Sequence, residues 1–444
     1  MNPNEVAFIQ YQDNLIKNKE IYLQEYKKVS AEVAKSPAQY KGQPVDFLLQ
    51  AMFFSPQDME RLRNLTGRLM RILNKTIDFY LENENFRQNF AFSPRLEKMI
   101  LKDPGYKRYI PMARFDVFYH CNGNFQFCEL NTDGSSGMVR ARELERIIGE
   151  SSVLADLKRE YEFTGFEIID TWVTALLENY KEFSKSNKKP QIAIIDFFSS
   201  GIPSEFVEFK KAFENRGCPT IVVDIRDLKY KNGKLYYEDF LIDCIYRRAV
   251  TGEIDENCDR VKDFTDAYLD GAVCVVGSLR SQIAHNKNIF SILHNPEKTF
   301  FLSQEERKFI EDHIPYTRNF DAGKREMIEF TTSNREKLVL KPADKYAARG
   351  VYIGRDYSQE AWKVLVEGIK EKDYLLQEFC HVPKKPMAMF IDGDITFVDN
   401  NYTLGLFLYN EELKGIYTRA GRQNIIGSNV ESFIVPNFIV EKKP

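Results

Sequence analysis

Three of the polar side chains around a turn signal, those of Asp116, Glu129 and Asn131, could together hold a divalent metal ion. Arg114 and Asp116 precede the dipeptide Asn122-Gly123, and Glu129 and Asn131 follow it. An Asn-Gly pair between alternating apolar residues predicts a β-hairpin with a two-residue turn. In that register Asp116 faces Glu129, and Arg114 faces Asn131. All four side chains then project from one face of the hairpin.

The opposite face of this hairpin is expected to be apolar. It carries Phe115, Val117, Tyr119, Cys128 and Leu130. On the polar face two carboxylates repel each other, so a positive group should lie between them. Arg114 could be that group in an ordinary hairpin. Mg²⁺ is the alternative, because it takes hard oxygen ligands and commonly uses one or two carboxylates while phosphates complete its shell.

A small polar loop follows the hairpin directly. Residues 132–137 read TDGSSG, and their hydroxyl and backbone N–H groups could bind an anion. The same composition is also typical of an ordinary turn. We expect Ser135 and Ser136 to contact a substrate, and Asn131 to add a neutral oxygen to the metal site.

Two lysines far along the chain could bind phosphate groups. Lys341 ends the apolar strand LVLKP, and the loop ADKYAARG that follows contains Arg349 and Gly350. Lys287 lies at the start of a predicted helix, NKNIFSILHN. A lysine beside a loop of small residues can neutralise a phosphate while backbone N–H groups surround it. Each lysine alone is equally typical of a strand or helix end in water.

The predicted strand YLLQEF ends in an amide and a carboxylate, Gln377 and Glu378. A glutamine offers both a donor and an acceptor, which the edge of an adenine ring requires. An ordinary strand end has a similar composition. These two positions are candidates for the adenine end of a nucleotide site.

Helices are predicted to form the first part of the chain. Ser55 can cap a helix that begins at Pro56, and apolar residues then recur every three or four positions from Met59 to Ile77. A second amphipathic helix is predicted over 166–183. Both apolar faces are typical of core packing.

Residues 191–295 are predicted to form a parallel sheet with helices on its faces. The strands QIAIIDFF, TIVVDI, DCIYRR and AVCVV alternate with helical segments, one of them over 203–216, and Asn232-Gly233 predicts a hairpin. The first strand is followed by FFSSGIPS, which lacks the GxGxxG fingerprint of dinucleotide sites. We therefore expect a Rossmann-like module that binds no dinucleotide.

The bulk composition argues against several classes of protein. Lys plus Arg (62) nearly balances Asp plus Glu (65), so the net charge of -3 gives no field to attract nucleic acid or anionic lipid. The seven cysteines form no CxxC pair and the five histidines show no ligand spacing, against a disulfide framework or a zinc site. The first residues lack a signal-peptide pattern, and no run of about 18 apolar residues occurs. A cytoplasmic protein without nucleic-acid or membrane partners is expected.

In combination these segments resemble the circularly permuted ATP-grasp enzymes, and most of all the synthetase part of the glutathionylspermidine synthetase family. ARFDVF, FCELNTDGSSG, DCIYRR, NKNIFSILH, IPYTR, VLKP, WKVL and LLQEF occur in the family's order and cover roughly residues 110–440. The permutation implies why the acidic residues precede the lysines in this chain, whereas they follow the lysines in ordinary ATP-grasp proteins.

The resemblance implies a role for each group of residues. Asp116, Glu129 and Asn131 are expected to bind Mg²⁺, and Arg114 to stabilise the transferring phosphoryl group. In YTRAGRQNII, Arg419 is the expected second phosphate-stabilising arginine, with Arg422 as its substitute. The expected ATP-binding residues are Lys287, Lys341, Arg349, Gly350, Gln377 and Glu378.

The sequence departs from that family in two places. Residues 1–110 contain no cysteine or histidine, so the Cys/His amidase half of the bifunctional enzymes is missing. The loop DKYAARG is poor in glycine, which leaves open whether residues 342–350 close over ATP. The two substrates therefore do not follow from the resemblance.

The expected fold is α/β, a circularly permuted ATP-grasp with a Rossmann-like module. Four parts are expected: a helical region (1–110), the metal-binding hairpin with a long helix (111–190), the Rossmann-like module (191–295) and the nucleotide-binding part (296–444). The expected activity joins a small-molecule or peptide carboxylate to an amine, using ATP and Mg²⁺, through an acyl phosphate. An ATP-grasp kinase and an inactive binding protein with this fold are the alternatives.

Overall fold

Helices form most of the N-terminal region of the computed structural model, which describes residues 3–120, 123–199, 201, 203–343, 350–369, 374–427 and 432–444. The predicted start of α3 is confirmed. Ser55 Oγ accepts the N–H of Asp58 at 3.1 Å, and the Asp58 carboxylate accepts the N–H of Ser55 at 2.9 Å. The helices are α1 (Pro3–Lys17), α2 (Lys19–Lys35), α3 (Pro56–Glu82), α4 (Glu84–Arg87) and α5 (Pro94–Leu101).

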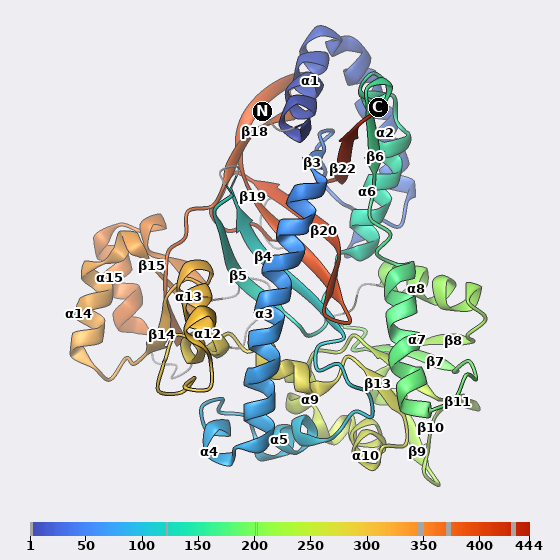
Figure 1. Cartoon of the computed structure of the whole chain (residues 1–444), viewed down its shortest axis with the longest axis vertical. Helices are drawn as coiled ribbons and strands as arrows, with labels where there is room; N and C mark the ends of the chain where they lie inside the picture. The colour runs from blue at the N-terminus through green and yellow to red at the C-terminus, as the bar shows by residue number, and fades with distance from the viewer. Residues whose placement is uncertain are drawn as a thin grey trace.

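A six-stranded antiparallel sheet joins the predicted hairpin to the C-terminal strands. Its order is β21–β20–β19–β4–β5, and β18 pairs with β19. In Figure 1, α3 crosses in front of this sheet, and it packs against β20. The strands are β4 (Met112–Tyr119), β5 (Phe125–Asn131), β18 (Lys384–Ile391), β19 (Asp394–Tyr409), β20 (Glu412–Gly421) and β21 (Phe433–Val435).

The hairpin of β4 and β5 has the predicted register at its open end. Arg114 pairs with Asn131, and Asp116 pairs with Glu129. Because directly opposed residues share a face of the sheet, all four side chains lie on one side. This side lines the cleft described below.

Near its turn the hairpin differs from the prediction. Val117 pairs with Phe127 instead of Cys128, because a β-bulge adds one residue to β5. The N–H of His120 donates to the carbonyl of Asn124 at 2.8 Å, so three residues separate these partners and the predicted two-residue turn is wrong. Residues 121 and 122 lie outside the described part of the chain. The bulge brings Cys128 to the cleft, whereas the sequence placed it on the apolar face.

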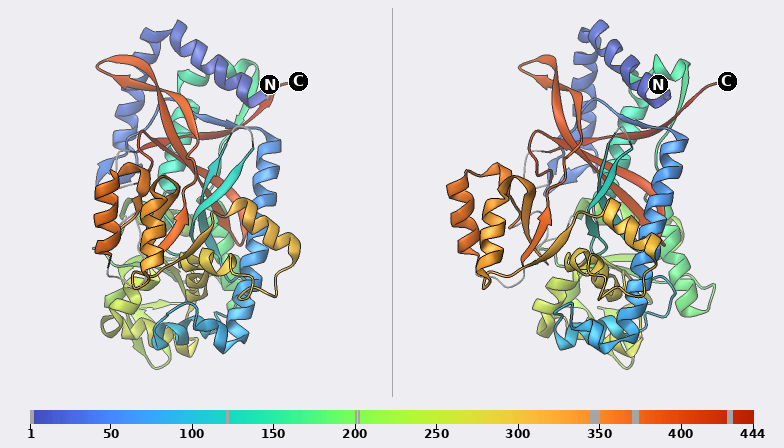
Figure 2. Two further views of the ribbon diagram at one scale, coloured as in Figure 1. Left: turned by 90° about the vertical axis from the view of Figure 1, so that its left-hand side faces the viewer. Right: turned by 60° about the vertical axis from the view of Figure 1, so that its left-hand side comes forward.

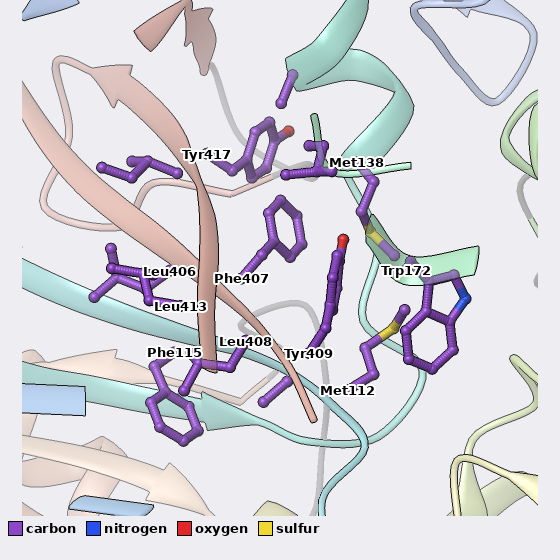
Figure 3. Close-up of a cluster of buried hydrophobic side chains, with 14 of the residues drawn as sticks. Met112, Phe115, Met138, Trp172, Leu406, Phe407, Leu408, Tyr409, Leu413 and Tyr417 are labelled. Atoms are coloured by element: carbon purple, nitrogen blue, oxygen red, sulfur yellow. The ribbon is translucent and has the colours of Figure 1, made fainter. Parts of the chain in front are cut away.

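An aromatic cluster ties the six-stranded sheet to its neighbours (Figure 3). The ring of Trp172, on α7 (Asp170–Ser184), is centred 5.4 Å from that of Tyr409 and 5.0 Å from that of Tyr246. At the other end of the cluster Phe407 stacks on Tyr417 at 6.2 Å. This packing fixes β20, whose Tyr417 forms part of the cleft wall.

Residues 192–276 contain the predicted parallel sheet. Its order is β13–β12–β7–β8, and every pair in it is parallel, which confirms the Rossmann-like module. The predicted hairpin at Asn232-Gly233 is also confirmed, since Lys231 pairs with Lys234. The elements are β7 (Ile192–Asp196), α8 (Pro203–Asn215), β8 (Thr220–Asp224), β9 (Lys229–Lys231), β10 (Lys234–Tyr237), β11 (Phe240–Ile242), β12 (Cys244–Arg247), α9 (Thr251–Glu256), α10 (Lys262–Asp270) and β13 (Cys274–Val276).

A small lobe stands out from the body of the molecule (Figure 2). It has its own sheet, in the order β14–β17–β15–β16, and its own core around Leu340, Trp362 and Leu376. The lobe consists of β14 (Thr317–Phe320), α14 (Arg325–Ser333), β15 (Leu338–Pro342), β16 (Tyr352–Ile353), α15 (Gln359–Gly368) and β17 (Tyr374–Glu378). Before it come α11 (Gln282–His285), α12 (Asn288–Leu293) and α13 (Gln304–His313).

A three-stranded sheet brings the two ends of the chain together. In it β22 (Asn437–Lys442) lies between β3 (Met52–Phe54) and β6 (Tyr161–Thr164), beside α6 (Met138–Glu150). A short pair, β1 (Gln39–Tyr40) and β2 (Gln43–Pro44), precedes them. None of the described helices is both long and apolar enough to cross a membrane.

Candidate active site

A cleft of about 1240 Å³ lies where the six-stranded sheet, the 132–137 loop, the parallel-sheet module and the small lobe meet. This exceeds the volume typical of a single small-molecule site, so the cleft can hold more than one ligand. Arg349 lies outside the described residues. The predicted site residues on the cleft wall are Arg114, Asp116, Glu129, Asn131, Ser135, Ser136, Lys287, Lys341, Gly350, Gln377, Glu378 and Arg419.

Asp116 is the centre of the charged end of the cleft. It is 4% exposed, and its carboxylate accepts hydrogen bonds from Arg114 Nε at 2.8 Å and Nη2 at 3.0 Å. Arg419 Nη2 lies 2.8 Å from the same carboxylate, whereas Arg422 is exposed and is not among the described residues that line the cleft. Two guanidinium groups share one buried acid, which leaves a net positive charge that can meet an anion.

A glycine on β19 makes room for this cluster. Gly405 pairs with Asp116 on one side and Tyr417 on the other. A Cβ atom at this position would lie 2.8 Å from Arg114 Cδ and 3.2 Å from Asp116 Oδ1. Any larger residue at 405 would therefore push Arg114 away from Asp116.

Glu129 is the second acid of the site. Lys287 Nζ lies 3.0 Å from its Oε1, and Asn131 Nδ2 lies 3.4 Å from its Oε2 and 3.1 Å from Asp116 Oδ2. Burial opposes ionisation of Glu129, but the ion pair with Lys287 outweighs it and lowers the pKa of Glu129 to about 2. Asn131 thus bridges the two carboxylates.

Lys341 reaches the same place from the lobe. Its Nζ lies 3.5 Å from the carbonyl of Cys128 and 5.4 Å from the ring centroid of Phe290. The backbone N–H of Lys287 donates to the carbonyl of Ala343 at 2.9 Å, which holds the start of α12 beside the end of β15. Burial lowers the pKa of Lys341 to about 8, and Lys287 adds to the effect.

The nucleotide binding predicted for Lys341 should therefore weaken as the pH rises through about 8. Phosphate attracts the protonated amine of Lys341 only, so above this pKa binding must first take up a proton. Calorimetric titration with ATP and Mg²⁺ from about pH 7 to about pH 9 measures the effect. Lys341→Arg should remove the pH step, because arginine stays charged. An affinity that is flat over this range in the unmodified protein contradicts the assignment.

Buried arginines of the parallel-sheet module hold the 132–137 loop. Arg247 Nη1 lies 2.5 Å from Asp133 Oδ1, and Arg248 donates to the carbonyl of Ser135. Arg248 also pairs with Glu205 at 2.9 Å, and Glu205 Oε2 accepts the N–H of Gly137 at 3.0 Å. The N–H of Gly137 is therefore occupied and is not one of the loop N–H groups that could bind an anion.

Gly137→Ala should destabilise the protein by about 1–3 kcal/mol. Gly137 has φ 110°, and a Cβ there would lie 2.9 Å from the ring of Tyr417. Gly67→Ala is the matched control, because Gly67 lies inside α3 with no atom closer than 3.8 Å to an added Cβ. The control should gain up to about 1 kcal/mol from helix propensity. Urea unfolding measures both, and equal changes would contradict the strain argument.

The end of the cleft around Gln377 and Glu378 is suited to the ring of a nucleobase. Gln377 is buried, and its Nε2 donates to Thr317 Oγ1 at 2.7 Å, so this donor already has a partner. The N–H of Glu378 donates to the carbonyl of Tyr316 at 2.9 Å, and its side chain is exposed. Apolar residues complete this end: Pro315, Val339, Ile353, Phe379 and Val382.

Tyr417, Arg140 and Tyr40 are cleft residues that the sequence analysis did not single out. Tyr417 lies against three guanidinium groups, with its ring centroid 5.9 Å from Arg114, 5.6 Å from Arg140 and 5.6 Å from Arg419. Nothing in its strand distinguishes Tyr417 from a core tyrosine. Arg140 lies on a helix with several charged residues, where a solvated position is the ordinary expectation.

Comparisons with known proteins found similarity to solved structures. No curated protein matches the sequence. The solved glutathione synthetase-like effector of Globodera pallida, in its apo form, is 11% identical over 95% of this chain and 97% of its own, with a TM-score of 0.60. A putative gamma-glutamylcysteine synthetase from Methylobacillus flagellatus is 10% identical over 85% and 87% of the two chains, with a TM-score of 0.44.

A match to a family model assigns the chain to a protein family. The model of circularly permuted ATP-grasp type 2 proteins matches residues 80–421, which is more than half of the chain. The similarity to the Globodera pallida protein shows the same fold over nearly the whole length. The α/β fold expected from the sequence is thereby confirmed, and the chain belongs to the circularly permuted ATP-grasp type 2 family.

Proposed function

We propose that this protein joins a carboxylate to an amine, using ATP, through an acyl phosphate. Its family supports a nucleotide-binding ligase of the ATP-grasp type. The observation that carries the proposal is the meeting of Asp116 and Glu129 with cations from distant parts of the chain at one end of the cleft. The terminal phosphates of ATP and their metal ion require such an arrangement.

The donor set at this end fits Mg²⁺. Asn131 lies within hydrogen-bond distance of both Asp116 and Glu129, and rotation of its amide turns the oxygen toward the two carboxylates. The described residues contain no cluster of three or more His, Cys, Asp or Glu side chains that could hold a metal ion. Two carboxylates and an amide leave ligand positions for phosphate oxygens, as Mg²⁺ prefers. When bound, the ion would neutralise charge on the phosphates.

The arginines have two successive partners in this proposal. In the structure Arg114 and Arg419 neutralise Asp116. With Mg²⁺ and ATP present, both guanidinium groups are released to the γ-phosphoryl group. Their planar donor forks suit its equatorial oxygens better than the point charge of a lysine. Lys287 and Lys341 bind the phosphates, and the apolar end of the cleft holds the adenine.

The reaction has two steps. An oxygen of the substrate carboxylate attacks the γ-phosphorus, the bond from that phosphorus to the β–γ bridging oxygen breaks, and ADP leaves. The amine nitrogen then attacks the acyl carbon, and phosphate leaves with the former carboxylate oxygen while the amine loses its proton to water. The product is an amide, a peptide-like bond of the kind that the resemblance to glutathionylspermidine synthetases implies. Ser135 and Ser136 line the cleft, and we propose that they contact the acyl substrate.

Oxygen transfer from the carboxylate tests this reaction. The protein is incubated with Mg²⁺, ATP and a panel of amino acids and peptides labelled with ¹⁸O in their carboxylates, with and without a panel of amines. ADP release should require both an acid and an amine, and mass spectrometry should find one ¹⁸O atom in each phosphate released. Phosphate that never carries the label would contradict the proposal.

The same assay distinguishes the proposed ligase from the two alternatives, a kinase and an inactive binding protein. A kinase forms ADP without an amine, and a phosphorylated product accumulates with no free phosphate. An inactive binding protein releases no ADP with any pair of substrates. In both cases the acyl-phosphate route proposed here is wrong.

A further inference from the structure

Arg140 on α6 is a buried guanidinium without a carboxylate partner among the described residues. It is 5% exposed, its Nε has no hydrogen-bond partner there, and the bond from its Nη2 to Ser136 Oγ is long, at 3.5 Å. A buried charge without a counter-ion is costly. The other two arginines of α6 are paired, Arg142 with Glu143 and Glu208, and Arg146 with Glu32, Glu143 and Glu150.

Two aromatic rings from opposite ends of the chain hold Arg140. Its guanidinium carbon lies 5.3 Å from the ring centroid of Tyr40 and 5.6 Å from that of Tyr417. All three residues line the cleft. Aromatic faces stabilise a cation but leave its N–H groups without acceptors. The guanidinium is therefore fixed in position with donors left for a ligand.

The N-terminus of α6 does not supply this binding site. Glu205 Oε2 accepts the N–H of Gly137 at 3.0 Å and that of Val139 at 3.4 Å. A carboxylate of the protein thus already occupies the end of the helix. Glu205 Oε1 also neutralises Arg248. Of the described arginines that line the cleft, Arg114, Arg248 and Arg419 have carboxylate partners and Arg140 has none.

Arg140 lies next to the reaction centre. Ser136 connects the two sites, because its carbonyl accepts Arg114 Nη1 at 2.8 Å and its hydroxyl faces Arg140. Arg114 and Arg140 both lie within 6 Å of the Tyr417 ring centroid, at 5.9 Å and 5.6 Å. One small molecule can therefore reach both guanidinium groups.

We propose that Arg140 binds a second carboxylate of the acyl substrate, so that the enzyme selects diacids, such as acidic amino acids or peptides with two acid groups, over monoacids. This inference rests on the proposed function for the identity of the reacting carboxylate. The guanidinium fork matches a carboxylate in a bidentate manner, which favours this anion. Lys41, also on the cleft wall, adds positive charge nearby.

Equilibrium binding tests the selection without relying on turnover. The full chain, with Mg²⁺ and a non-hydrolysable ATP analogue, is titrated calorimetrically with succinate, glutarate and adipate and with the monoamide of each. At least one diacid should bind about 10- to 100-fold more tightly than its monoamide. This preference should disappear in Arg140→Met, while Arg140→Lys keeps part of it. Arg146→Met, on the same helix, should keep the full preference.

The outcomes separate this inference from the proposed function. A diacid preference that depends on Arg140 supports the inference even if no amide is formed, in which case only the proposed function fails. Equal binding of diacids and monoamides, no diacid binding below about 50 mM, or a preference that persists in Arg140→Met overturns the inference. Arg140→Met should melt within about 4 °C of the unmodified protein without ligand, since it removes an unpaired charge. A larger fall shows a structural role and also overturns it.

Discussion

Asp116→Asn should abolish detectable turnover and destabilise the protein by about 3–5 kcal/mol. The Asp116 carboxylate is buried and pairs with both Arg114 and Arg419. Asparagine keeps the shape but removes the charge, so two buried guanidinium groups are left without their shared partner. The change also removes one of the two carboxylates proposed to bind Mg²⁺. Urea unfolding measures the first effect, and ADP release well below the melting temperature measures the second.

An aspartate on the surface provides the control for this substitution. Asp170 pairs with Arg216 Nε at 3.0 Å, and its side chain is half-exposed. Asp170→Asn should cost no more than about 1 kcal/mol, because water screens an exposed ion pair, and turnover should not change. If folded Asp116→Asn retained the rate of the unmodified protein at limiting Mg²⁺, the metal assignment would be wrong.

The hairpin shows how far sequence reasoning reaches. Alternation along β4 and β5 indicated which residues share a face, and the Asn-Gly signal indicated a turn near the right place. The turn prediction was wrong, yet Asp116 still faces Glu129. The loop has one residue more than predicted, and the extra residue of the bulge at Cys128 brings the strands back into the predicted register. A bulge leaves no clear pattern in a single sequence. The predicted pairing of Asp116 with Glu129 was therefore correct, although the prediction included neither the longer loop nor the bulge.

Contacts between distant segments could not be predicted from the residues alone. Alternation indicates which face of a strand is buried but not which strand lies beside it. The pairing of β19 with β4 brings Gly405 beside Asp116, and only this pairing shows why a small residue is needed there. Motif order suggested that Lys287 and Lys341 act together, whereas the bond from Lys287 to Ala343 shows how they are held together.

The cleft residues that escaped the sequence analysis share one property. Arg140, Tyr40 and Tyr417 come from three separate parts of the chain, and each has an ordinary local sequence. The chemistry of Arg140 depends on its burial away from water. A sequence does not show this burial, so an arginine that lacks a counter-ion cannot be recognised there as unusual. The proposed four-part division of the chain stays a prediction.

Arg114→Ala should lower kcat/KM by about 100-fold or more, which corresponds to about 3 kcal/mol of transition-state stabilisation. Arg114 donates to Asp116 in the structure and is proposed to move to the transferring phosphoryl group. Its loss should reduce kcat more than it raises the KM for ATP, because the added negative charge develops only in the transition state. Steady-state kinetics with the acid and amine identified by ¹⁸O transfer measure both constants.

Two further variants separate catalysis from packing. Arg108→Ala removes a half-exposed arginine that lies 3.7 Å from Glu411, and it should change kcat/KM little. Arg114→Lys keeps the charge but loses the planar fork, so it should recover only part of the rate. Asp116 retains Arg419 when Arg114 is replaced, so Arg114→Ala should destabilise the fold less than Asp116→Asn does. A kcat/KM for Arg114→Ala within about threefold of the unmodified protein would mean that this arginine only holds Asp116, and phosphoryl stabilisation would then fall to Arg419 and the two lysines.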